Sequence, residues 1–206
     1  MAVTAREPRD AMSAAVAPLS ALMSVDACMD AVKIFGVRAV LAYRPDLSER
    51  ERRSEACTGI LNRSDVINLL MGLPVGQAVP VAALSDAERR ALKHVPRGVV
   101  LREGATVTRA AVQPLRVDLA VVPGRGWQSA MEQAERFTPF CARAALVDGP
   151  LRRRDDAIMQ ADFYGIGLLA VQGDEVEMLV PPRPFVRKRY TAAGWRFVED
   201  VHRQVS

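Results

Sequence analysis

One acidic residue lies inside an apolar segment, and its carboxylate could serve as a metal ligand. Asp118 stands in the strand-like run Leu115–Val122. Mg²⁺ prefers oxygen ligands, and its sites in proteins usually combine one or two carboxylates with oxygens of the substrate. The preceding strand-like segment, Ala105–Val112, contains no acid. A lone carboxylate is a poor magnesium site, so the sequence predicts that Asp118 holds no metal.

The last part of the chain holds a second group of candidates, which are basic residues spaced by aromatic ones. Cationic side chains neutralise phosphates and aromatic rings stack on bases, so this pattern is typical of a nucleic-acid contact. The alternative is that these charged residues are simply exposed to solvent and bind nothing. The aromatic residues are Phe185, Tyr190, Trp195 and Phe197. The predicted nucleic-acid-binding residues are Arg183, Arg187, Lys188, Arg189 and Arg196, with Arg125 from an earlier loop.

The composition argues against several other chemistries. Three widely spaced cysteines and two histidines argue against a disulfide framework and against a zinc site. The net charge of +4 fits nucleic-acid binding without requiring it. The longest apolar run, Gly165–Val171, is strand-sized, and the polar N-terminus lacks a secretory signal. We therefore expect no membrane partner and a cytoplasmic location.

Residues 1–80 are expected to form a mostly helical region. The turn-rich stretch from Leu73 to Ala82, with Pro74, Gly76 and Pro80, predicts a domain boundary near residue 80. The elements expected before it are a helix over Val25–Val32 ended by Gly36, a strand over Val37–Tyr43, and helices capped by Ser48 and Ser64.

Residues 81–206 are expected to form an α/β (α+β) domain with a basic C-terminal tail. Its mixed β-sheet would be flanked by helices, because strand and helix patterns alternate along it. The expected elements are a helix from Ser85, strands over Val99–Arg102, Ala105–Val112 and Leu115–Val122, a helix over Trp127–Phe137, a strand over Cys141–Val147, a further helix, and a hairpin of Gly165–Val171 with Val176–Val180.

Three stretches of this half resemble the restriction-endonuclease-like, or PD-(D/E)XK, superfamily. The helix from Trp127 to Phe137 resembles the helix after the catalytic strand, with Gln133 and Phe137 in a Q-x-x-x-aromatic pattern. The segment FCARAALVD resembles the strand that follows. The hairpin YGIGLLAVQGDEVEMLVPPRPF is similar to that of a bacterial branch. The resemblance implies the core order α-β-β-β-α-β.

The resemblance also implies where catalytic residues would stand, namely two acids and a lysine around one magnesium ion. If Asp118 is the second acid, the lysine position holds Ala120. If Asp118 is the first acid, the other two groups should lie in the loop PGRG, where only Arg125 carries a charge. In either register two of the three groups are missing. Asp118 and Gln133 would then be remnants of an inactive site.

Three functions fit these observations. The leading hypothesis is a non-catalytic PD-(D/E)XK-like protein that needs no cofactor and binds DNA or another protein, alone or as a homo-oligomer. The second is a Mg²⁺-dependent nuclease with a rearranged site that recruits Glu103, Glu132 or Glu135. The third is a winged-helix-type transcriptional regulator built from the helices DVINLLMG and SDAERRALKHV.

Overall fold

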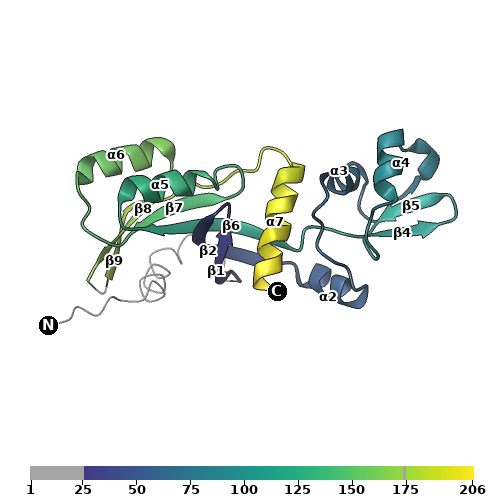
Figure 1. Cartoon of the computed structure of the whole chain (residues 1–206), viewed down its shortest axis with the longest axis horizontal. Helices are drawn as coiled ribbons and strands as arrows, with labels where there is room; N and C mark the ends of the chain where they lie inside the picture. Colours follow the sequence, from purple (N-terminus) through teal and green to yellow (C-terminus); the bar gives the residue numbers. More distant parts are fainter. Residues whose placement is uncertain (1–25, 174) are drawn as a thin grey trace. The chain divides into compact units, whose positions relative to one another are not determined.

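The computed structural model describes residues 26–173 and 175–206, which fall into two compact units (Figure 1). Unit 1 contains the chain up to Arg44 and Val117–Val186. Unit 2 contains Pro45–Arg116 and Arg187–Ser206. The turn-rich stretch from Leu73 to Ala82 predicted a boundary near residue 80. In the structure this stretch lies within unit 2. The part of the expected helical region before residue 26 lies outside the described residues.

Unit 1 begins with a β-hairpin of strands β1 (Cys28–Ile34) and β2 (Val37–Pro45). The prediction of a helix over Val25–Val32 is wrong for the described residues, because Cys28–Ile34 form strand β1. Side chains alternate at the end of β1, with Val32 and Ile34 buried and Lys33 exposed. Phe35 and Gly36 form the turn with φ angles of 55° and 76°, so Gly36 serves a type I′-like hairpin turn instead of ending a helix.

A six-stranded mixed sheet organises unit 1, in the order β1-β2-β6-β7-β8-β9. Strands β6, β7 and β8 are parallel, and β9 returns antiparallel to β8. The helices that connect these parallel strands, α5 and α6, lie on one face of the sheet, as Figure 1 shows. The remaining elements are β6 (Leu115–Gly124), α5 (Trp127–Glu135), β7 (Ala142–Val147), α6 (Arg154–Tyr164), β8 (Gly167–Gln172) and β9 (Glu175–Val180).

Both faces of this sheet are packed with apolar side chains. The expected apolar face of α5 is confirmed, since Trp127, Ala130, Met131 and Ala134 are buried. Strand alternation sends Ala144 and Leu146 of β7 to the same face, where a buried cluster also includes Leu119, Val121, Ala42 and Leu169. The central strands are buried on both faces, as parallel strands usually are.

Unit 2 combines helices with a small antiparallel sheet in the order β3-β5-β4. Helix α3 packs against α4 and against the C-terminal helix α7. No helix among the described residues has both the length and the apolar character to cross a membrane. The elements of unit 2 are α2 (Leu47–Glu55), α3 (Ser64–Gly72), β3 (Ala78–Pro80), the short 3₁₀ turn η1 (Val81–Ala83), α4 (Asp86–Leu92), β4 (Val100–Glu103), β5 (Thr106–Arg109) and α7 (Ala192–Val205).

The expectation of a mixed α/β fold is confirmed, but the three successive strands do not share one sheet. Strands β4 and β5 lie in the small sheet of unit 2, and β2 is the neighbour of β6. Val107 of β5 packs with Leu69 of α3 and Leu92 of α4, which holds the hairpin in unit 2. The continuous α-β-β-β-α-β core is thus replaced by strands drawn from two parts of the chain.

Some of the helix N-caps predicted from the sequence are found in the structure and others are not. The capping box of Ser85 with Glu88 is confirmed at α4. Helix α2 is capped by Asp46, whose side chain accepts from the backbone of Glu49, and Ser48 lies within the helix. The expected basic tail is mostly helix α7, which Thr191 caps.

Candidate functional site

Asp118 is held by an arginine of the neighbouring strand. Nε of Arg44, on β2, donates to Oδ2 of Asp118 at 2.7 Å, and Nη2 donates to Oδ1 at 2.9 Å. Such a two-pronged contact engages both carboxylate oxygens. The hydrogen bonds and the charge of Asp118 raise the pKa of Arg44. A protein cation therefore already sits beside the carboxylate that a magnesium ion would need.

The other expected catalytic positions offer no metal chemistry in the structure. Ala120 is fully buried in the sheet. Nε2 of Gln133 donates to Oγ of Ser129 at 3.1 Å, one turn earlier on α5, so Asp118 and Gln133 are bonded to different partners. Over residues 26–173 and 175–206, no group of three or more acidic, cysteine or histidine side chains is placed to hold a metal ion.

The basic residues predicted from the sequence are divided between the two units. Arg125 and Arg183 belong to unit 1, and the other four belong to unit 2. Nη2 of Arg183 donates to the carbonyl of Asp162 at 3.1 Å, at the end of α6. Arg187 donates to the side chain of Gln113 at 3.2 Å and lies 5.2 Å from the ring centre of Tyr190. Lys188, Arg189 and Arg196 are exposed in unit 2.

The tryptophans are core residues. Trp127 is 6% exposed and its Nε1 donates to the carbonyl of Arg152 at 3.0 Å. Trp195 is 3% exposed, and its Nε1 donates to Oε1 of Glu199 at 2.9 Å. The guanidinium of Arg109 lies 4.8 Å from the Trp195 ring centre. Neither ring is available for stacking on a base.

A buried ionic cluster joins α7 to α2 inside unit 2. Arg53 donates to Oε1 of Glu49 at 2.7 Å and to both carboxylate oxygens of Glu199 at 2.7 and 2.9 Å. The backbone N–H of Leu61 also donates to Glu199, at 3.2 Å. Burial acting alone would raise the pKa of Glu49, but the hydrogen bonds and charges of Arg52 and Arg53 outweigh it and lower that pKa. This cluster fixes the position of α7.

Positive charge is concentrated in unit 2. Its sequence has 16 arginine and lysine residues against 10 acidic ones, a net charge of +6. The stretches that make up unit 1 have 12 basic and 14 acidic residues, a net charge of −2. A polyanion would therefore be attracted to unit 2 more strongly than to unit 1. Counting charges over the whole chain hid this asymmetry.

Helix α4 and the segment after it present cations that the sequence reasoning missed. Arg90, Lys93 and Arg97 are exposed, as is Arg102 on β4. Nη2 of Arg102 donates to the carbonyl of Leu92, which brings this arginine beside the C-terminal end of α4. Ala91 and Leu92 are buried and anchor the helix. The spacing of basic residues in ERRALKHVPRG was the available signal.

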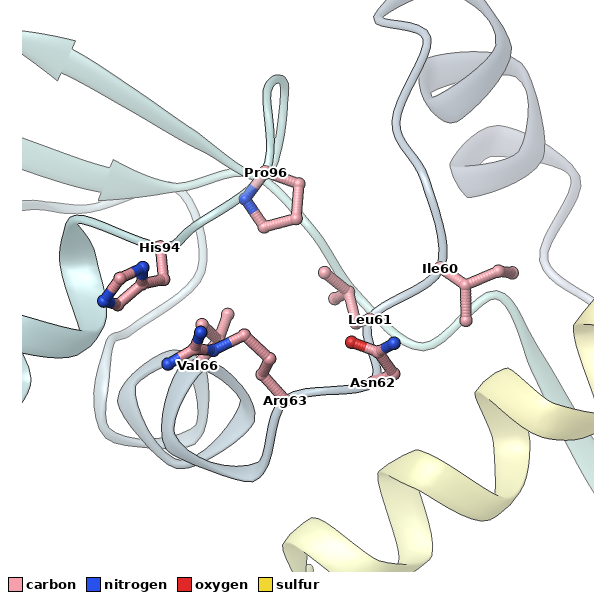
Figure 2. A pocket seen from close by; sticks show the side chains of 7 residues that line it. All are labelled: Ile60, Leu61, Asn62, Arg63, Val66, His94 and Pro96. Atoms are coloured by element: carbon pink, nitrogen blue, oxygen red, sulfur yellow. The ribbon is translucent and has the colours of Figure 1, made fainter.

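An open pocket with a cavity volume of about 30 Å³ lies at the start of α3. Apolar side chains of Ile60, Leu61, Val66 and Pro96 line it, together with polar Asn62, Arg63 and His94. The Arg63 side chain extends toward the side on which His94 lies (Figure 2). Arg63 donates to both carboxylate oxygens of Asp65 at 2.7 and 3.1 Å. All of these residues belong to unit 2.

No protein-family model, no curated protein and no solved structure matches this chain.

Proposed function

We propose that this protein binds nucleic acid without cutting it, and that unit 2 makes the contact with duplex DNA. The observation that carries the proposal is the net charge of +6 on unit 2, together with the exposed cations of α4 and β4. Release of counterions from phosphates supplies most of the affinity in non-specific DNA binding. Unit 1, with a net charge of −2, lacks that driving force.

The arrangement of unit 2 supports the same proposal. In a winged-helix unit, a short strand after the first helix pairs with the last strand of a hairpin. Unit 2 has this pairing, since β3 follows α3 and lies beside β5. It departs from the pattern because only the turn η1 and α4 lie between β3 and β4, where such units have two helices. Helix α4 would then approach the DNA groove.

The PD-(D/E)XK resemblance bears on unit 1 only. It applies to β6, α5 and β7 and to the β8–β9 hairpin, which form where the sequence predicted them. We propose that unit 1 is an inactive member of that group. The bidentate Arg44–Asp118 pair supports this reading, because a guanidinium competes with a metal for the same oxygens.

Salt dependence tests the proposed DNA binding. The full chain is titrated into a fluorescently labelled 30-base-pair duplex, and anisotropy is followed between 50 and 200 mM NaCl. Neutralisation of about four phosphates by the α4 and β4 cations predicts a slope near −3.6 in a plot of log affinity against log salt. Affinity should therefore fall by about two orders of magnitude over this range. Failure to bind even at 50 mM salt would exclude the proposal.

The absence of catalysis is a separate prediction. Plasmid DNA incubated with the purified chain and Mg²⁺ or Mn²⁺ is expected to stay intact, and Asp118→Ala should behave as the wild type. The reason is the ion pair that already engages both oxygens of Asp118. Gel electrophoresis over hours checks this. Metal-dependent degradation that disappears in Asp118→Ala would show instead that the chain is a nuclease.

A further inference from the structure

The pocket at the start of α3 is lined both by apolar side chains and by side chains that carry hydrogen-bond donors. Val66 and Leu61 are buried and form part of its wall, whereas Asn62, Arg63 and His94 are exposed. The Asn62 amide and the Arg63 guanidinium are hydrogen-bond donors, and the His94 ring has an N–H as well. The pocket is open to solvent, so a phosphate group can reach these donors from outside.

The surroundings of the pocket favour an anion. His94 lies between Lys93 and Arg97 in the chain, and both of these neighbours are exposed. The pocket therefore adjoins the segment that supplies the cations of the proposed DNA surface. A guanidinium suits phosphate because its donors match two oxygens at once.

One contact opposes anion binding. The carboxylate of Asp65 accepts two hydrogen bonds from Arg63, with both side chains about half exposed, at 46% and 50%. The hydrogen bond with Arg63 lowers the pKa of Asp65 to about 2, so the carboxylate is ionised at neutral pH. An exposed ion pair of this kind adds little stability, so an incoming phosphate can replace Asp65 as the partner of Arg63.

We propose that this pocket binds a backbone phosphate of nucleic acid through Arg63, Asn62 and His94, and that Asp65 competes for Arg63 in the free protein. This inference rests on the proposed function, because it assigns one phosphate contact to the DNA surface of unit 2. Binding would exchange the Arg63–Asp65 pair for an arginine–phosphate pair. Asp65 would thereby set the affinity without touching DNA.

Two substitutions with opposite effects test the proposal. Arg63→Gln should weaken DNA binding several-fold and make the salt slope shallower by about 0.9, the equivalent of one phosphate. Asp65→Asn should strengthen binding by up to about fivefold, since it removes a competing exposed carboxylate. If the Arg63–Asp65 pair had only a structural role, Asp65→Asn would not increase the affinity for DNA. Anisotropy titrations of the full chain supply both measurements.

The chain contains a matched control pair. Arg203 and Asp200 on α7 also form an exposed ion pair in unit 2, at 3.2 Å. Arg203→Gln and Asp200→Asn change the charge equally and should leave affinity within about twofold of wild type. The proposal is overturned if the Arg63 and Asp65 variants match these controls, or if Asp65→Asn weakens binding.

A second probe separates failure of the pocket from failure of DNA binding. Inorganic phosphate, titrated at constant ionic strength with chloride, should shift the Asn62 side-chain amide signals saturably in ¹H–¹⁵N spectra. Arg63→Gln should abolish that shift. If wild type binds no DNA, the proposed function fails, and a saturable phosphate shift still supports the pocket as a phosphate site. If wild type binds DNA and Arg63→Gln alters only phosphate binding, the nucleic-acid assignment of the pocket fails. No saturable shift would overturn the pocket itself.

Discussion

Replacement of Arg53 by methionine is expected to lower the free energy of unfolding by about 3–5 kcal/mol. Arg53 is 5% exposed, and Glu49 and Glu199 on either side of it are 2% and 1% exposed. Methionine would leave Glu199 buried with the Trp195 and Leu61 N–H donors but without Arg53, and a buried charge without its counterion is strongly destabilising. Glu49 would keep Arg52 as a partner. The loss therefore falls mainly on the contact between α2 and α7.

Urea denaturation followed by Trp195 fluorescence measures this loss, in a Trp127→Phe background that removes the other tryptophan. Arg50→Met is the matched control, because Arg50 lies on the same helix and is exposed. The control should change stability by no more than about 0.5 kcal/mol. A loss below about 1 kcal/mol in Arg53→Met would mean that the cluster relaxes or admits water.

Local patterns predicted the elements better than their partners in the sheet. The hairpin β8–β9, helix α5 and the capping box of α4 depend on residues close in sequence, and all three form as expected. Strands β4 and β5 were also predicted, but the pairing of β5 with β3 depends on burial against α3 and α4. Periodicity within a strand does not specify which sheet it joins.

Helix α7 shows how attention to charge concealed a helix. The sequence pattern predicted a basic tail that holds Arg187, Lys188, Arg189 and Arg196. In the structure, however, Trp195, Val198 and Val201 are buried at helical spacing. Glu199, also buried, gave no sign in the sequence that it would pair with Arg53, which lies 146 positions earlier. A long-range ion pair of this kind leaves no local pattern to read.

The candidate site was predictable only in part, for the same reason. The sequence reveals that Asp118 lacks an acid on the preceding segment, but its partner Arg44 is 74 residues away. The pocket joins Asn62 and Arg63 with His94, and its existence depends on the packing of α3. The basic residues of α4 were visible in the sequence, and only the fold reveals which of them are exposed.

Charge reversal on α4, Arg90→Glu with Lys93→Glu, is expected to have the largest effect on function. DNA affinity at 50 mM salt should fall by at least about 50-fold, because two phosphate contacts are lost and two negative charges face the polyanion. Anisotropy titration checks the loss. Arg38→Glu with Arg152→Glu applies the same charge change to exposed residues of unit 1 and should weaken binding much less.

The neutral variant Arg90→Gln with Lys93→Gln separates contact from repulsion. A glutamate near the C-terminal end of α4 interacts unfavourably with the helix dipole, at a cost of about 0.3–1 kcal/mol. The charge reversal therefore also destabilises the fold. Glutamine avoids that cost, and its salt slope should be shallower by about 1.8, which corresponds to two phosphates. An unchanged slope with intact folding would exclude α4 from the DNA contact. Equal losses in the unit 1 control would mean that net charge, not this helix, determines binding.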